Sequence, residues 1–215
     1  YGATESLPVA SIKGNEILAD TWTESVNGKG TCVGKALPGL DIRILKITDK
    51  PIRDYNKEDQ LGPYEIGEII VKGDVVTKSY ENNPAETLLA KIQNGDELWH
   101  RMGDVGYLDD QSRLWFCGRK AHRVRLEGET LYTICCEAII NQHPEIYRSA
   151  LVGISPQENG IYGAAAIIVE PHKNSTIDRG DLINEVRALS ASSEDTIKIG
   201  HFFVYQNFPV DIRHN

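Results

Sequence analysis

The chain has 215 residues, of which 40% are hydrophobic, so it can bury one large core or two small ones. Its formal net charge of −8 argues against a general nucleic-acid binder or a protein that docks on anionic membranes. No apolar run approaches the roughly 18–20 residues of a membrane-spanning helix, and no signal peptide is visible. The four cysteines are not spaced as zinc ligands, so we interpret them as free thiols and expect a cytoplasmic protein.

The first third of the chain combines one amphipathic helix with several strands. Leu18, Trp22 and Val26 recur at helical spacing, and this stripe is expected to pack in the core rather than to form a site. The Asn27–Gly30 stretch contains two glycines and should end that helix. Alternating or apolar runs predict strands, and a polar stretch between them predicts a surface loop. The expected strands cover residues 32–34, 41–47 and 66–73, and the expected loop covers residues 48–64.

A second helix is expected shortly after residue 80. Asn83 can cap it, Pro84 suits its first position, and Glu86 stands where a capping box places an acid. Gly95 is expected to end it. These signals are structural, and we assign no chemistry to them.

The middle of the chain carries the clearest candidate chemistry. Residues 102–108 are expected to form a sharp glycine turn that presents Asp104, and a strand over 113–117 leads into Gly118 and Arg119. Arginine can grip phosphate or ribose oxygens with two hydrogen bonds, and aspartate can accept bonds from two hydroxyl groups. Taken alone, the same residues also suit a hairpin with a solvated ion pair.

Neighbouring polar residues have plainer interpretations. The Asp109–Ser112 turn is expected to be solvated rather than a metal site, and His100 is expected to be a surface or packed imidazole. For Lys120, Arg123 and Arg125, a ligand-binding cluster and a solvated strand face stay open as equal alternatives.

The C-terminal part of the chain mixes expected strands with two expected helices. The second of these helices has an apolar face made of leucine, isoleucine and valine side chains. The expected strands cover residues 122–126, 148–154, 164–170 and 201–205, the helices cover 134–142 and 179–189, and the apolar face consists of Leu182, Ile183, Val186 and Leu189.

Several short motifs follow one another in a fixed order. The sequence Tyr-Gly-Ala-Thr-Glu occupies residues 1–5, Gly-Asp occupies 103–104, and Gly-Arg occupies 118–119. Each motif is weak alone. The ordered set, with its spacing along the whole chain, resembles the adenylate-forming superfamily, which includes acyl-CoA synthetases, peptide-synthetase adenylation domains and luciferases.

This resemblance implies an α+β chain made of two parts. Residues 1–118 would be the C-terminal part of the large AMP-binding domain, with a β-rich, distorted barrel-like subdomain. Residues 119–215 would be the small, mobile C-terminal lid domain. In the family the lid swings about a residue that is usually Asp or Lys, and here that residue is Ala121. The departure implies either a hinge that tolerates a small residue or an altered rotation.

The resemblance also implies a site for ATP and Mg²⁺. By this resemblance Tyr1 stacks on adenine, Thr4 contacts the α-phosphate and Glu5 holds Mg²⁺. Arg119 would contact the ribose or the phosphates, near Asp104. The residues carried over are Thr4, Glu5 and Arg119 as catalytic groups, Tyr1, Gly2, Thr4, Asp104 and Arg119 as ATP or AMP ligands, and Glu5 as the magnesium ligand.

The ending Phe208–Asn215, with Leu114–Lys120 and Tyr132–Thr133, looks most like the β-lactone synthetases of bacterial long-chain olefin biosynthesis. Such an enzyme would activate a long-chain β-hydroxy fatty acid as acyl-AMP, release pyrophosphate and close a β-lactone. Expected partners are these small molecules and, by resemblance, a thiolase-like enzyme and a decarboxylase. One alternative is a fatty acyl-CoA ligase, which would also use CoA, or a peptide-synthetase adenylation domain. The other is a non-catalytic nucleotide-binding or interaction module.

Finally, the resemblance implies that the chain is a piece of a longer enzyme. It starts at Tyr1 rather than at a methionine, and the family places its phosphate loop and acyl pocket further upstream. The lysine that the family uses near its C-terminus would follow Asn215. We therefore expect little or no activity from the isolated chain.

Overall fold

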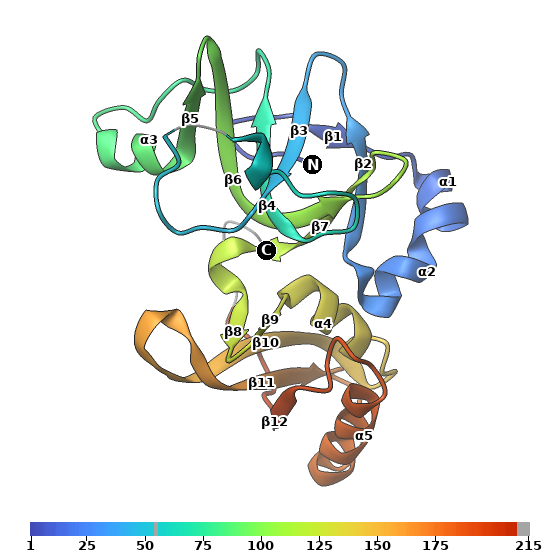
Figure 1. The fold of residues 1–215 in the computed structure, drawn as a ribbon. Helices are drawn as coiled ribbons and strands as arrows, with labels where there is room; N and C mark the ends of the chain where they lie inside the picture. The colour runs from blue at the N-terminus through green and yellow to red at the C-terminus, as the bar shows by residue number, and fades with distance from the viewer. Residues whose placement is uncertain (54–55, 210–215) are drawn as a thin grey trace. The chain divides into compact units, whose positions relative to one another are not determined.

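The computed structural model describes residues 1–53 and 56–209 and separates the chain into two compact units (Figure 1). The first unit contains residues 1–25 and 29–121, and the second contains residues 26–28 and the described residues from His122 onward. Both units contain strands and helices, so the α+β fold class is confirmed. Within the described residues, no helix is both long enough and apolar enough to cross a bilayer.

An antiparallel sheet of seven strands forms the first unit, and it curls rather than lying flat (Figure 1). Its strands run in the order β1-β2-β7-β6-β4-β3, and β5 pairs with β6 outside that path. The strands are β1 (Ala10–Ser11), β2 (Thr31–Ala36), β3 (Asp41–Leu45), β4 (Gly67–Lys72), β5 (Lys91–Asn94), β6 (Glu97–Leu108) and β7 (Leu114–Arg119), and a short 3₁₀ turn covers Lys57–Asp59.

Strand β4 is buried on both faces because the curled sheet packs apolar side chains on each side of it. Ile69 and Val71 join one cluster of buried residues, whereas Ile70 joins a second cluster with Ile92 and Trp99. Each of these five side chains is fully buried. Alternation along a strand sends neighbouring residues to opposite faces, so a continuous apolar run marks a strand covered on both sides.

The predicted helical stripe near the N-terminus does not pack in the core. This segment is helical from Gly14 to Lys29, in the order α1 (Gly14–Glu16), π turns (Ile17–Thr21), α2 (Trp22–Glu24) and π turns (Ser25–Lys29). Leu18 is 78% exposed and Trp22 is 56% exposed, so the prediction of a core stripe was wrong. Helical spacing shows that residues share a face, but not what that face meets. The helix ends as predicted, with Gly28 and Gly30 at positive φ.

Helix α3 (Pro84–Ala90) begins where the sequence predicts and ends earlier. The Asn83 side chain accepts a hydrogen bond from the Glu86 N–H at 3.2 Å, which confirms the cap. Gly95 does not end the helix, because strand β5 follows Ala90 directly and Gly95 lies in the turn between β5 and β6. The apolar side chain of Ile92 is fully buried in the sheet, and this burial outweighs the local helix signal.

The predicted glycine turn over residues 102–108 is a bend inside strand β6. The strand runs without a break from Glu97 to Leu108, so the expected chain reversal was wrong. Gly103 has a φ of 67°, a left-handed value that favours glycine, and the pairing register shifts next to Val105. The strand therefore changes direction locally while it keeps its pairing with β4 and β7.

Asp109 is buried, so the prediction of a solvated turn was wrong for this residue. Its side chain accepts hydrogen bonds from Trp115 Nε1 at 2.9 Å and from Arg113 Nε at 2.6 Å. It also accepts the Arg113 and Gln111 backbone N–H groups. These donors satisfy the carboxylate inside the fold and close the turn between β6 and β7.

The second unit pairs β10 with β11 antiparallel and β11 with β12 parallel, with β8 and β9 as a separate hairpin. Its core includes Leu182 and Val186 from the predicted apolar helix face, packed with Ile167. All four cysteines of the chain are free and buried, which confirms the thiol interpretation. The elements are β8 (Val124–Leu126), β9 (Glu129–Leu131), α4 (Thr133–Ile140), β10 (Ile146–Pro156), β11 (Tyr162–Pro171), α5 (Arg179–Ala191) and β12 (Ile199–Val204), with 3₁₀ turns at Lys120–His122 and Glu158–Gly160.

Candidate functional site

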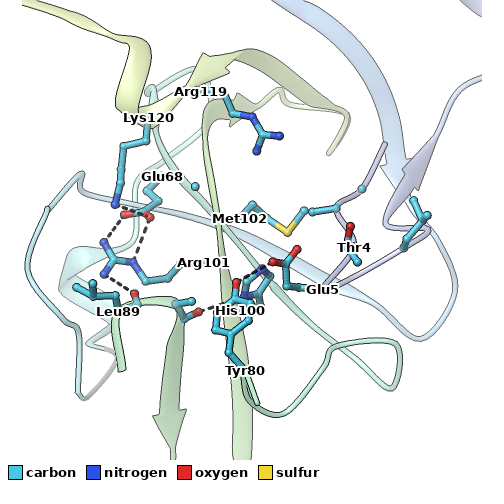
Figure 2. A pocket seen from close by; sticks show the side chains of 15 residues that line it. Thr4, Glu5, Glu68, Tyr80, Leu89, His100, Arg101, Met102, Arg119 and Lys120 are labelled. Atoms are coloured by element: carbon cyan, nitrogen blue, oxygen red, sulfur yellow. Dashed lines mark hydrogen bonds and ion pairs between the residues drawn. The ribbon is translucent and has the colours of Figure 1, made fainter. Parts of the chain in front are cut away.

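The first unit contains a cavity of about 610 Å³ lined mainly by polar groups. Figure 2 shows two groups of side chains in it: an ionic cluster around Glu68 and a second group around Glu5. The lining consists of Gly2, Ala3, Thr4, Glu5, Leu7, Glu68, Tyr80, Leu89, Ala90, His100, Arg101, Met102, Gly103, Arg119 and Lys120.

The Thr4–Glu5 pair projects from a tightly closed loop at the cavity. Ala3 and Ser6 exchange two backbone hydrogen bonds of 3.0 and 2.9 Å, which fold the loop back on itself. The Thr77 N–H donates to the Glu5 carbonyl oxygen at 2.8 Å and fixes the loop from outside. The loop therefore presents a hydroxyl group and a carboxylate side by side at the cavity.

The Glu5 carboxylate accepts a hydrogen bond from the Tyr80 hydroxyl, with 2.8 Å between the two oxygens. This bond is the main reason why the pKa of Glu5 lies below its ordinary value. Burial, with the bond to Glu5, raises the pKa of Tyr80 to about 12. Burial also lowers the pKa of His100 to about 4, so the packed imidazole beside Glu5 is neutral at pH 7.

Asp104 and Arg119 lie directly opposite each other on β6 and β7, which places their side chains on one face of the sheet. Arg119 Nη1 donates to Asp104 Oδ1 at 2.8 Å, and the Tyr1 hydroxyl donates to Asp104 Oδ2 at 2.6 Å. Burial raises the pKa of Asp104 despite these two donors, because it disfavours the charged carboxylate more than they favour it. Asp104 is 3% exposed, whereas the Arg119 side chain is 56% exposed.

The six residues expected to contact the nucleotide fall into two groups. Four of them line the cavity, namely Gly2, Thr4, Glu5 and Arg119. The other two, Tyr1 and Asp104, lie outside its lining and connect to it through Arg119. The Tyr1 ring contacts the Phe116 ring at 5.9 Å between centroids, and Tyr1 takes part in the buried cluster that includes Val9 and Ile42.

A buried ionic cluster on the other side of the cavity was not predicted. Glu68 accepts hydrogen bonds from Arg101 Nε at 3.1 Å, from Arg101 Nη2 at 2.7 Å and from Lys120 Nζ at 2.9 Å. Arg101 and Lys120 also donate to the carbonyl oxygen of Thr48, and Arg101 donates to that of Leu89. This cluster joins β4, β6 and the segment after Arg119.

One signal for this cluster was present in the sequence. Glu68 interrupts the apolar strand Gly67–Lys72, and a charge in a run that is otherwise buried needs a partner in the fold. The sequence near Glu68 does not predict that partner, because Arg101 is 33 residues away and Lys120 is 52 residues away. The structure places Lys120 in the cavity lining, where it pairs with Glu68, rather than on a solvated strand face.

The donor set fits a nucleotide with Mg²⁺. Magnesium prefers oxygen ligands and keeps several waters and phosphate oxygens, so one carboxylate such as Glu5 suffices from the protein. A hydroxyl group on Thr4 and the guanidinium of Arg119 suit phosphate and ribose oxygens at the same cavity.

Comparison with known proteins shows which enzymes the chain resembles. The chain is 40% identical over its whole length to an olefin beta-lactone synthetase from Xanthomonas campestris pv. campestris, and 41% identical to one from Stenotrophomonas maltophilia. It spans 39% of the length of each of these relatives. Its fold is similar to o-succinylbenzoate CoA synthetase from Bacillus subtilis in complex with an acyl-adenylate intermediate. The TM-score is 0.71 and the identity 24%, over 97% of this chain and 37% of that one.

No protein-family model matches the chain. The curled sheet, the small α+β unit and the similarity to both synthetases over the whole of this chain nevertheless agree with the resemblance to the adenylate-forming superfamily. Within that superfamily it is similar to the olefin β-lactone synthetases along its entire length.

Proposed function

We propose that the chain is part of an ATP-dependent enzyme that activates a long-chain β-hydroxy acid as an acyl-adenylate and closes it to a β-lactone. The observation that carries this proposal is the identity of 40% and 41% to two olefin β-lactone synthetases over the whole chain. The cavity with Thr4, Glu5 and Arg119 supports it, because these groups suit a polyphosphate.

The described residues take distinct roles in this proposal. Thr4 donates to an α-phosphate oxygen, and Arg119 contacts the ribose or the phosphates from the end of strand β7. Glu5 holds Mg²⁺, which offsets the negative charge of the phosphates when it is bound. Asp104 holds Arg119 in place and keeps acceptor capacity for ribose hydroxyls, since each carboxylate oxygen can accept two bonds. Gly2 lines the cavity at the nucleotide, and Tyr1, outside that lining, donates to Asp104 through its hydroxyl group.

The proposed reaction has two steps on one acyl group. A carboxylate oxygen of the acid attacks the α-phosphorus of ATP, and pyrophosphate leaves. The 3-hydroxyl oxygen of the same substrate then attacks the activated acyl carbon and loses its proton, and AMP leaves as the four-membered lactone ring forms. Because nucleophile and electrophile belong to one molecule, a site that fixes their geometry lowers the entropic barrier.

The two-part organisation of the chain is a proposal for the whole enzyme. Residues 1–118 would complete the large AMP-binding domain, and residues 119–215 would belong to the small lid domain, with Ala121 at the hinge. The division between the compact units falls between Ala121 and His122. We place the enzyme in the cytoplasm, since all four thiols are free.

A second candidate is an acyl-CoA ligase, in which CoA rather than the 3-hydroxyl group captures the acyl-adenylate. The similar fold of o-succinylbenzoate CoA synthetase favours it, although 24% identity supports the fold alone. Both candidates share the first step and differ in the second.

An exchange experiment tests the shared step. The full-length protein is incubated with ATP, Mg²⁺, labelled pyrophosphate and a long-chain 3-hydroxy acid, and label entering ATP is measured. The proposal predicts exchange that depends on the acid. ATP binding by calorimetry without exchange, for any 3-hydroxy or unsubstituted acid, would instead indicate a non-catalytic nucleotide-binding module.

A further inference from the structure

We propose that Tyr80 is a positioning residue that holds the Glu5 carboxylate ready for Mg²⁺. The inference rests on the proposed function, because it takes Glu5 as the magnesium ligand. It starts from a contact between residues 75 positions apart in the sequence, the 2.8 Å hydrogen bond from the Tyr80 hydroxyl to Glu5 Oε1. Figure 2 shows the two side chains together at the cavity.

The hydrogen bond fixes the orientation of the carboxylate without consuming its binding capacity. A free glutamate side chain turns about its terminal bonds, and this freedom must be lost when a metal binds. The Tyr80 hydroxyl anchors Glu5 Oε1 at one of its two lone pairs and leaves Oε2 for another ligand. A carboxylate anchored in this way loses less entropy on binding a cation.

Tyr80 is itself held by the start of helix α3. Its backbone N–H donates to Thr87 Oγ1 at 3.0 Å, and that hydroxyl donates to the Asn83 carbonyl oxygen at 2.9 Å. Asn83 caps the helix through Glu86. The position of the phenol ring is therefore determined by a capped helix end rather than by a loose loop.

The segment from Thr77 to Tyr80 donates hydrogen bonds to both the backbone and the side chain of Glu5. The Thr77 N–H donates to the Glu5 carbonyl oxygen at 2.8 Å, while the Tyr80 hydroxyl donates to the carboxylate. The buried Lys91 Nζ donates to Thr77 Oγ1 at 3.2 Å, and its positive charge helps to lower the pKa of the Glu5 carboxyl. Backbone and side chain of Glu5 are thus held by one segment.

The chemistry of the partner distinguishes Glu5 from Glu68 in the same cavity. Glu68 is paired with two cations, Arg101 and Lys120, so the three side chains together carry a net positive charge that disfavours a metal there. Glu5 is held by a neutral hydroxyl group, and among the described residues it forms no ion pair. A cation in place of Tyr80 would compete with Mg²⁺ for the carboxylate, whereas a phenol does not. The arrangement orients the charge and preserves it.

The test compares Tyr80→Phe with the unmodified full-length protein and two further variants. Tyr80→Phe removes only the hydroxyl group. Tyr64→Phe is the matched control, since its hydroxyl donates to Asp110 at 2.9 Å outside the cavity lining. Glu5→Gln removes the proposed metal ligand. For each protein, pyrophosphate exchange is titrated with Mg²⁺, and Mn²⁺ binding in the presence of ATP is measured directly by water-proton relaxation.

We expect Tyr80→Phe to raise the half-saturating metal concentration about tenfold in both measurements, as partners of metal ligands typically do. The maximal rate should return at saturating Mg²⁺, and Tyr64→Phe should behave like the unmodified protein. Unchanged metal dependence in Tyr80→Phe, together with weaker metal binding in Glu5→Gln, would overturn the positioning role and leave the proposed function standing. Unchanged dependence in both would remove Glu5 as the metal ligand as well.

Discussion

Arg119 and Asp104 face each other across β7 and β6, one exposed and one buried, with 2.8 Å between Nη1 and Oδ1. The Arg119 side chain is 56% exposed, so its ion pair is screened by solvent and adds little to stability. Its exposed end reaches the cavity, where a guanidinium can meet phosphate or ribose oxygens. The pair therefore joins a buried carboxylate to an exposed guanidinium that can meet a ligand.

Arg119→Ala should weaken ATP use while leaving the fold almost unchanged. We expect the KM for ATP to rise at least about tenfold, the loss of one charge-assisted contact, and the free energy of unfolding to fall by less than about 1 kcal/mol. Steady-state kinetics and urea unfolding of the full-length protein measure the two effects. Arg43→Ala, which breaks the pair with Asp41 outside the cavity lining, is the control and should leave the KM unaltered.

Asp104→Ala should lower both ATP use and stability. It leaves the Tyr1 hydroxyl without its acceptor and releases Arg119, and an orphaned buried donor costs about 1–3 kcal/mol. Urea unfolding and ATP kinetics of this variant check both effects. If Asp104→Ala and Arg119→Ala both turn over ATP normally, the nucleotide assignment of these two residues fails.

Glu68→Ala should be the most destabilising single change near the cavity. It leaves the buried Arg101 guanidinium without its carboxylate, and breaking a buried pair costs about 3–5 kcal/mol. Glu97→Ala removes a carboxylate that is 45% exposed and pairs with Lys72, so it should cost less than about 1 kcal/mol. Equal losses of unfolding free energy in urea would show that the Glu68 cluster is not buried as described.

Glu137 should make stability depend on pH. Burial raises its pKa to about 7 in the folded protein from an ordinary value of 4.5. Between these values the folded state holds a proton that the unfolded state has released. The contribution of protonated Glu137 to the free energy of unfolding is therefore complete below about pH 4.5 and disappears as pH rises through 7.

Glu137→Gln should remove this dependence. The amide oxygen can still accept the Leu151 N–H bond, and the amide carries no charge at any pH. As the pH rises from 5 to 8, the free energy of unfolding of the variant should increase relative to that of the unmodified protein. The expected increase is on the order of 2–3 kcal/mol, measured by urea unfolding. Glu158→Gln, on an exposed turn, serves as the control. Parallel curves for the unmodified protein and Glu137→Gln would contradict the burial argument.

Local signals predicted the parts of the fold that depend on neighbouring residues. The cap of α3 needed only Asn83 and Glu86, three positions apart, and the C-terminal end of the first helix needed only its glycines. Burial against distant segments was beyond such signals. Leu18 and Trp22 share a face, but the sequence could not show that this face meets solvent.

For the candidate site too, sequence motifs predicted some residues, whereas contacts between distant residues could not be predicted. The ordered motifs located Thr4, Glu5 and Arg119, which the fold brings to one cavity, although their roles stay predictions. The contacts of Glu68 with Arg101 and of Glu5 with Tyr80 cross 33 and 75 positions, and no spacing rule connects them. Only the folded first unit brings these residues together.

The product formed without CoA tests the central claim most directly. The full-length protein is incubated with ATP, Mg²⁺ and a long-chain 3-hydroxy acid, AMP release is followed, and the acyl product is identified by mass spectrometry and NMR. The proposal predicts one β-lactone for each AMP released, with no requirement for CoA. A thioester that forms only when CoA is added would contradict the proposal and identify an acyl-CoA ligase.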